Sequence, residues 1–167
     1  MKNAVVCMSL LMSLIWSGCG VYSFTGASIS PEVKTFSVQY FPNRASLVQP
    51  LLSQAITEKI KERFISQTSL RQVERDGDLQ FEGYISDYKA SPVAIQGTQT
   101  AALNRLTISV LVKFTNTKDD KQNFETTFTR YADYDSQKSL SEEEATLIDE
   151  INRQLVDDIF NKSVSNW

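Results

Sequence analysis

The fold is decided by the stretch Arg105-Leu106-Thr107-Ile108-Ser109-Val110-Leu111-Val112-Lys113-Phe114-Thr115. Within it, every second residue is apolar: Leu106, Ile108, Val110, Val112 and Phe114. This alternation predicts a half-buried strand, because successive side chains of a strand point to opposite faces of its sheet. Its length and regularity favour a central position in that sheet.

The segments around this strand predict three more strands. Residues 116–122 are polar and predict a hairpin loop, so residues 123–134 should return antiparallel beside residues 105–115. Residues 79–86 and 33–40 show the same alternation. A short extended stretch is also expected around Leu70 to Val73. The inner face of the returning strand is expected to carry Phe124, Thr126 and Phe128.

A first helix is predicted after residue 50, because its apolar residues recur at steps of three and four. These residues are Leu52, Ala55, Ile56, Ile60 and Phe64. Its start is expected between Ser46 and Pro50, since Ser46 and Gln49 have the spacing of a capping box.

A second helix is predicted near the C-terminus. We expect Ser141 at its N-cap and Glu144 at N3, with the acids Glu142 to Glu144 facing the positive end of the helix dipole. Asn161 is a plausible stop. The apolar stripe contains Leu147, Ile148, Ile151, Leu155, Ile159 and Phe160, while Asp149, Glu150, Asn152, Arg153, Asp157 and Asp158 are expected largely off it.

The predicted order is therefore β-α-β-β-β-α. Two amphipathic helices need an apolar surface, and the sheet offers one inner face, which favours an α+β two-layer sandwich. Both helices should pack on one face of a four-stranded, mostly antiparallel sheet. Residues 89–104 show no clear period and are expected to form a long loop or irregular strand ends, a feature often associated with function.

The N-terminus predicts a lipid anchor. After Lys2, residues 4–16 form an uncharged stretch of 13 residues, the length of a signal-peptide core and too short to span a bilayer. Trp16-Ser17-Gly18-Cys19 then resembles the lipobox of bacterial lipoprotein precursors, although Trp16 stands where an aliphatic residue is usual. We expect a signal peptide over residues 1–18, a tether lipidated at Cys19 over residues 19–31, and one domain over residues 32–167. The alternatives are an ordinary cleaved signal or a buried N-terminal helix.

The composition makes several classes of function unexpected. The mature part has 16 basic and 20 acidic residues, a net charge of −4, which makes nucleic acid an unexpected partner. It has no cysteine after Cys19, and the whole chain has no histidine, so it lacks the commonest general base and a common metal ligand. No nucleophile or phosphate-binding motif occurs. We therefore expect no enzyme, no cofactor and no metal.

Acidic clusters have simpler interpretations than catalysis. Consecutive helical residues such as Glu142 to Glu144 point about 100° apart and do not converge on one ion. Asp119 and Asp120 suit a solvated turn. A polar and aromatic group near the end of the fourth strand could form a contact surface; its members are Tyr131, Asp133, Tyr134 and Asp135.

Three basic residues are candidates for a phosphate-bearing lipid, which would need Lys or Arg beside apolar surface. Lys89 and Arg105 flank the long loop, and Lys138 precedes the last helix. Individually, each is also compatible with an ordinary solvated surface charge.

The pieces together resemble the LptE family of lipopolysaccharide-assembly lipoproteins, in the form found in Bacteroidetes. The resemblance is carried by Cys19 with Gly20-Val21-Tyr22-Ser23-Phe24, by Val33-Lys34-Thr35-Phe36-Ser37-Val38-Gln39-Tyr40-Phe41-Pro42-Asn43, and by the order of elements. It implies an outer-membrane lipoprotein on the periplasmic side, which plugs the β-barrel LptD and assists insertion of lipopolysaccharide.

The same resemblance guides the site residues. In relatives, one basic residue in the loop between the second and third strands, and another ahead of the last helix, are associated with lipopolysaccharide. Residues 91–104 contain no Lys or Arg, so Arg105 is only the nearest neighbour of the first, and Lys138 is an unaligned counterpart of the second. The alternative function is a small envelope lipoprotein with a structural or chaperone-like role. A hydrolase would require two converging acids in a pocket.

Overall fold

The computed structural model describes residues 29–47, 49–93 and 102–164. The expected signal peptide, Cys19 and most of the expected tether lie outside these residues. The elements follow in the order β1 (Thr35–Val38), α2 (Leu52–Gln67), β2 (Arg71–Gln72), β3 (Leu79–Pro92), β4 (Leu103–Asn116), a 3₁₀ turn (Asp120–Gln122), β5 (Phe124–Asp135) and α3 (Leu140–Val164).

The strands form one sheet with the order β2-β1-β3-β4-β5. β1 is parallel to both of its neighbours, and the long strands β3, β4 and β5 pair antiparallel. The parallel pair β1 and β2 is joined through α2, the kind of crossover that parallel neighbours require. The stretch 105–115 lies within β4, between two long partners, which confirms its expected interior position.

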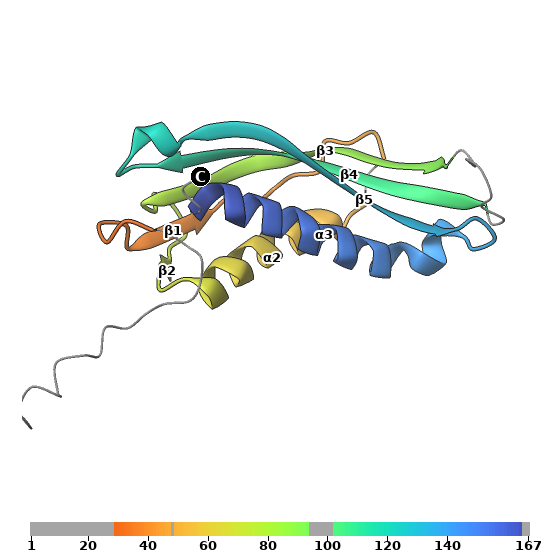
Figure 1. Cartoon of the computed structure of the whole chain (residues 1–167), viewed down its shortest axis with the longest axis horizontal. Coiled ribbons are helices and arrows are strands. Elements are labelled where there is room, and N and C mark those ends of the chain that lie inside the picture. Colours follow the sequence, from red (N-terminus) through yellow and green to blue (C-terminus); the bar gives the residue numbers. More distant parts are fainter. Residues whose placement is uncertain (1–28, 48, 94–101, 165–167) are drawn as a thin grey trace, which may run out of the picture.

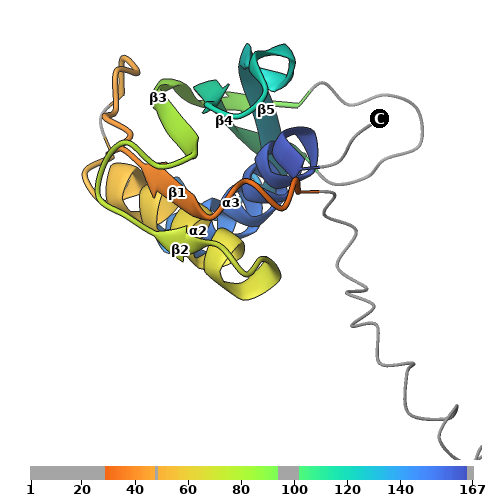
Figure 2. The same ribbon diagram turned by 90° about the vertical axis from the view of Figure 1, so that its left-hand side faces the viewer.

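Both helices lie on the same side of the sheet, and in the part of the chain that the structure describes no helix lies on the other side (Figures 1 and 2). α3 packs against β4 and β5, while α2 packs against β1 and β2 and against α3. The molecule is elongated, and the described chain begins at the end where β1 and the C-terminus of α3 lie (Figure 1). The two-layer α+β arrangement predicted from the sequence is thereby confirmed.

A row of phenylalanines joins the two layers. Phe64 of α2 lies against Phe36 of β1, Phe81 of β3 and Phe160 of α3, with ring centroids 5.4, 4.7 and 5.0 Å away. The row continues from Phe81 to Phe114 of β4 at 5.0 Å. Because Phe64 is fully buried and touches three elements, it fixes the helical layer on the sheet.

The predicted count of four strands is wrong, because the sheet has five. The additional strand, β2, has only two residues, and both are exposed, so it leaves no alternating pattern. Backbone hydrogen bonds hold it: the Arg71 N–H donates to the Lys34 carbonyl at 3.0 Å, and the Val73 N–H donates to Phe36 at 2.9 Å. The expected extended stretch near residues 70–73 is this strand.

The first helix begins later than predicted. α2 starts at Leu52, and its N-cap residue, Leu51, forms no side-chain capping hydrogen bond. The side-chain oxygen Oε1 of Gln49 instead accepts a hydrogen bond from the Leu51 N–H at 3.0 Å. A capping box with Ser46 at the N-cap would require Gln49 to be helical. Pro50 disfavours a helical conformation in the residue before it, which is Gln49.

The last helix begins earlier and ends later than predicted. The Glu142 carboxylate accepts both the N–H and the hydroxyl of Ser139 at 2.8 Å, and the Glu142 N–H donates to the Ser139 carbonyl at 3.2 Å. The box is therefore Ser139 and Glu142, which have the same spacing as Ser141 and Glu144 two residues later. α3 also continues past Asn161 to Val164, a buried residue.

Of the two alternatives for residues 89–104, a long loop or irregular strand ends, the described part of this segment forms strand ends, because β3 continues to Pro92 and β4 begins at Leu103. The end of β3 has no buried residue after Tyr88, so it lacks the alternation that marks a strand in the sequence. Residues 94–101, the middle of the expected loop, lie outside the described residues.

Candidate functional site

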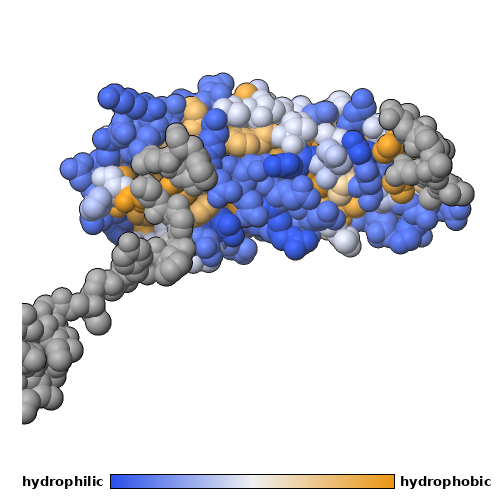
Figure 3. All heavy atoms as spheres, in the orientation of Figure 1, coloured by the Kyte–Doolittle hydropathy of each residue, from blue (hydrophilic) through white to orange (hydrophobic). Residues whose placement is uncertain are grey.

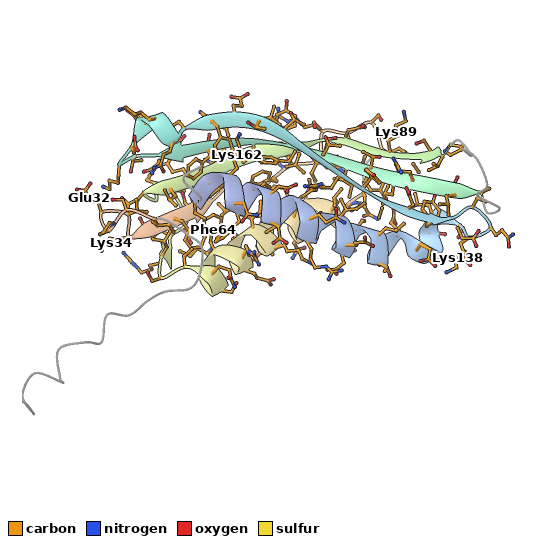
Figure 4. All side chains as sticks on the ribbon, in the orientation of Figure 1. Glu32, Lys34, Phe64, Lys89, Lys138 and Lys162 are labelled. Carbon is orange, nitrogen blue, oxygen red and sulfur yellow. The ribbon has the colours of Figure 1, made fainter. Side chains whose placement is uncertain are left out.

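The three basic residues singled out from the sequence lie toward the same end of the molecule, opposite the end where the described chain begins. Figure 4 shows Lys89 on the sheet layer and Lys138 at the start of α3, with Lys34 and Lys162 at the other end. Arg105 is opposite Ser91 of β3, near Lys89, which is opposite Thr107. We call this region the basic end, defined by Lys89, Arg105 and Lys138.

Arg105 is held firmly on the outer face of the sheet. It faces Asp133 across the β4–β5 ladder, and its Nε and Nη2 lie 2.7 and 2.9 Å from the two carboxylate oxygens. Its guanidinium carbon lies 3.6 Å from the centroid of the Tyr131 ring. The hydrogen bonds lower the pKa of Asp133 and raise the pKa of Arg105. Arg105 is therefore already engaged within its own domain.

Lys138 and Lys89 differ in their surroundings. The Lys138 ammonium lies 2.5 Å from the Glu143 carboxylate, and this contact raises the pKa of Lys138, although its side chain is 56% exposed. Lys89 is exposed on β3 and forms no ion pair with any residue of the ranges 29–47, 49–93 and 102–164. Among these three cations, Lys89 is thus the least engaged in the part of the chain that the structure describes.

The polar and aromatic group near the end of β5 is divided between two faces. Tyr131 is half exposed and lies with Asp133 beside Arg105 on the outer face. Tyr134 is buried in the core instead, as alternation along a strand requires. Only Tyr134 of this group is therefore excluded from a contact surface on the outer face.

The three consecutive acids of α3 bind different partners. Glu142 caps the helix through Ser139, and Glu143 binds Lys138. Glu144 turns inward, where its two oxygens accept from the Tyr88 hydroxyl at 2.5 Å and from Gln49 Nε2 at 2.8 Å. Burial, followed by the bond to Glu144, raises the pKa of Tyr88. This bridge, which ties β3, α3 and the chain before α2 together, was not foreseen from the sequence, because Glu144 was assigned to a cap.

A hollow of about 330 Å³ lies beside this bridge, between α2 and α3. None of the three basic residues lines it. Its lining consists of Gln49, Leu51, Ala55, Lys59, Ser141, Glu144, Ala145, Ile148, Asp149 and Asn152. Asn152, which is expected largely off the apolar stripe of α3, is in fact buried, with 1% exposure.

Within the described residues, no group of three or more His, Cys, Asp or Glu side chains is arranged to hold a metal ion. The helices of that part of the chain also include none with the length and apolar character to cross a membrane. The surface in Figure 3 is mostly hydrophilic, with hydrophobic residues in separate patches.

Comparison with known families gives a clear result. The model of a family described as LptE, lipopolysaccharide-assembly, matches residues 33–163. The chain belongs to the LptE family. The match runs from just before β1 almost to the end of α3, so the whole two-layer domain is the LptE domain. Comparison with curated proteins gives no significant match.

Solved structures show the same fold at low sequence identity. The hypothetical protein CT253 from Chlamydia trachomatis is 10% identical with a TM-score of 0.53, covering 80% of this chain and 99% of its own. The minor lipoprotein from Acinetobacter baumannii is 13% identical with a TM-score of 0.50, covering 80% and 97%. Protein XCC0632 from Xanthomonas campestris is 10% identical with a TM-score of 0.51, covering 83% and 86%. At these identities the similarity concerns the fold alone.

Proposed function

We propose that this LptE-family protein is a non-catalytic lipoprotein, anchored through Cys19 on the periplasmic side of the outer membrane. In this proposal it binds and plugs the LptD β-barrel and assists transport and insertion of lipopolysaccharide. The observation that carries the proposal is the family match over residues 33–163. The alternative of an envelope lipoprotein unrelated to lipopolysaccharide is an outcome of the experiments below.

The placement of the described ends supports this arrangement. The described chain starts at Ile29, which packs against the core at the end opposite Lys89 and Lys138 (Figures 1 and 4). A lipid on Cys19 would therefore hold one end of the domain near the membrane. Because α3 has 25 residues, it alone is about 37 Å long, which separates the anchored end from the basic end.

Copurification tests the partner. The tagged chain is extracted from its native membranes in mild detergent, and we expect LptD to copurify with it in a fixed ratio. Depletion of the chain should lower the amount of lipopolysaccharide at the cell surface. If no β-barrel copurifies and surface lipopolysaccharide is unchanged after depletion, the proposal is wrong and the alternative function is favoured.

We propose further that the basic end contacts the phosphate groups of lipopolysaccharide, with unequal contributions from its three residues. Lys89 has no ion-pair partner within the described ranges, so it can bind a phosphate without breaking an existing contact. Lys138 would have to share its ammonium with Glu143. Arg105 contributes least, because both of its hydrogen bonds and its ring contact are made within the domain.

Equilibrium binding of purified lipopolysaccharide to single variants tests this order. Lys89→Gln should weaken binding by about threefold, the size of effect expected for one exposed charge contact, and Arg105→Gln should weaken it less. Lys34→Gln serves as the matched control, since Lys34 lies at the opposite end (Figure 4). An equal loss in Lys34→Gln and Lys89→Gln would mean that only the net charge matters and that the basic end is no site.

A further inference from the structure

One edge of the sheet is formed by a long strand with no neighbour. β5 is the last strand on its side and pairs only with β4 in the part of the chain that the structure describes, whereas β2 at the opposite edge has two residues. The β4–β5 register is unbroken from Phe124 to Asp135, so β5 has no bulge. Residues 124–135 also contain no Pro and no Lys. Bulges, Pro and Lys are common means by which proteins block an edge strand, and β5 has none of the three.

The register shows which backbone groups of this strand are free. The Ser136 N–H donates to the Ala102 carbonyl at 3.1 Å, so this pair is hydrogen-bonded across the β4–β5 ladder. Because bonded and non-bonded pairs alternate in an antiparallel ladder, the even-numbered residues of β5 bond to β4 and the odd-numbered residues face away from it. These odd-numbered residues form no backbone hydrogen bond with any described residue. We call them the β5 edge, defined by Glu125, Thr127, Thr129, Tyr131 and Asp133.

The apolar core reaches this edge on the inner face of β5. The ring centroid of Phe124 lies 5.2 Å from that of Phe114, the end of the buried row of phenylalanines, and Phe128 lies 6.2 Å from Phe124. Phe124 and Phe128 pack against the core but are only partly buried. Arg130, the charged residue on this face of β5, is bound by both carboxylate oxygens of Asp158 of α3. An incoming strand would therefore meet apolar surface and a charge that is already paired.

On the outer face, the β5 edge carries an acid that is free to bind a cation. Glu125 is exposed and forms no ion pair among the described residues. Lys113, which faces it across the ladder, lies 3.6 Å from Glu82 instead. Asp133, at the other end of the edge, is held by Arg105. A basic side chain of a partner would therefore be favoured beside Glu125 and not beside Asp133.

We propose that the β5 edge binds an extended segment of a partner protein, which adds a sixth strand to the sheet. The free N–H and C=O groups recur at every second residue, about 7 Å apart, and another extended backbone offers complementary groups at that spacing. A lipid has no such donors and acceptors along its length. Apolar side chains of the segment cover Phe124 and Phe128, and a basic side chain lies opposite Glu125. The proposal does not require LptD to be the partner, so it can fail independently of the proposed function.

A short peptide of defined sequence tests the pairing. The probe is acetyl-Thr-Ile-Thr-Ile-Lys-Ile-Thr-amide, which in an antiparallel arrangement places its Lys opposite Glu125 and two of its Ile residues opposite Phe124 and Phe128. It is titrated into the full chain carrying Cys19→Ala. The control is the same peptide with N-methyl groups on its second Thr and on its Lys. This control keeps the side chains but loses two N–H groups that face β5, and it should not bind.

Amide hydrogen exchange, followed by NMR, reports the pairing residue by residue. In the free chain, the N–H groups of Thr127 and Thr129 should exchange quickly, because they face away from β4. With the probe bound, we expect them to exchange more slowly by about tenfold or more. The Phe128 N–H, which faces β4, should exchange slowly in both states.

Variants of the chain separate backbone pairing from side-chain contact. Thr127→Pro removes an N–H that β4 does not use and should weaken binding of the probe by about tenfold, the effect of one well-placed hydrogen bond. Thr127→Ala, the matched control, keeps this N–H and should bind as the parent chain does. Glu125→Lys should weaken binding by about threefold, the size expected for one exposed charge pair. Replacing the Lys of the probe by Glu should restore binding to this variant.

Thermal unfolding of each variant shows whether it is folded. If Thr127→Pro is unfolded, the N-methylated peptide and Glu125→Lys provide the test. The proposal is overturned if the N-methylated peptide binds as well as the probe, because the contact is then not strand addition, or if the probe protects no amide of the β5 edge. It is also overturned if the Thr127 and Thr129 N–H groups are already protected in the free chain, because the edge is then covered, by a second copy if the chain is a dimer in solution.

Discussion

Asp78 holds the first residues of β1 against the turn before β3, and Asp78→Asn tests how much this contact contributes. One carboxylate oxygen, Oδ2, accepts the N–H groups of Lys34 and Thr35 at 2.8 and 3.0 Å and the Thr35 hydroxyl at 3.0 Å. The Lys118 ammonium lies 3.1 Å from the other oxygen. These contacts hold the pKa of Asp78 far below its usual value of 3.8, and the hydrogen bond from the Lys34 N–H makes the largest contribution.

The size of the effect follows from these contacts. Asn keeps an oxygen that can accept hydrogen bonds but loses the charge, and charge-assisted bonds are about twice as strong as neutral ones. For three bonds, we expect the free energy of unfolding at pH 7 to fall by about 2 kcal/mol. The position is sensitive because Lys34 and Thr35 lie where β1 begins, shortly after the expected tether.

The pH dependence gives an independent check. A lowered pKa adds stability that is present above the pKa of the unfolded chain and is lost as the pH falls toward the folded value. At pH 3 the unfolded Asp78 is mostly protonated, whereas the folded one is still ionised. The difference between the parent chain and Asp78→Asn should therefore shrink by about 1 kcal/mol between pH 7 and pH 3.

Urea unfolding at both pH values measures these quantities. Asp76→Asn is the matched control, since Asp76 lies in the same turn with φ of 55°, a left-handed conformation that Asn tolerates. We expect it to change the stability by less than about 0.5 kcal/mol. The reasoning is refuted if Asp78→Asn lowers the free energy of unfolding no more than Asp76→Asn does. It is also refuted if Asp78→Asn lowers this free energy equally at pH 3 and pH 7.

Three further predictions concern Gly83, Tyr88 and Cys19. Gly83→Ala should lower the free energy of unfolding by about 3 kcal/mol, because its Cβ would lie 2.1 Å from the Leu111 carbonyl oxygen and 2.7 Å from the Phe41 ring; chemical denaturation measures this. Tyr88→Phe should lower the free energy of unfolding by about 1–2 kcal/mol at pH 7, because the hydrogen bond to Glu144 is lost. That difference should shrink above about pH 10, where Tyr88 ionises in the unfolded chain but stays neutral when folded. Cys19→Ala should leave the domain folded but without its lipid, as mass spectrometry of the mature N-terminus can show; an unmodified thiol at Cys19 in the parent chain would contradict the anchor.

Much of the fold could be predicted from the sequence, because burial on one face leaves a regular pattern. The alternation in residues 105–115 identified β4, and the spacing of apolar residues identified both helices. β2 was expected only as a short extended stretch and not as a strand of the sheet, because its two residues bury nothing. The ends of the helices were misplaced for a different reason: Ser139 and Ser141 offer the same capping spacing, and only packing of the neighbouring residues decides between them.

The candidate site was less predictable, because it depends on contacts between elements. Arg105 was selected for its charge, but the sequence does not reveal that Asp133 would face it across the ladder. That pairing depends on the register of β4 with β5, which a single sequence specifies only through its turn and its apolar pattern. The surroundings of Lys89 depend on a second register, that of β3 with β4, which places Lys89 opposite Thr107.

The position of Asn152 on the buried face of α3 could have been predicted from the sequence. It lies four residues after Ile148 and three before Leu155, so it belongs to the same face of a helix with 3.6 residues per turn. Its polar type favours a position largely off the apolar stripe, although the spacing places it on that stripe. A polar residue on a buried stripe needs a partner, and no residue that the structure describes supplies one to its Oδ1. Assigning each helical residue to a face before considering its chemistry would therefore have predicted the burial of Asn152 from the sequence.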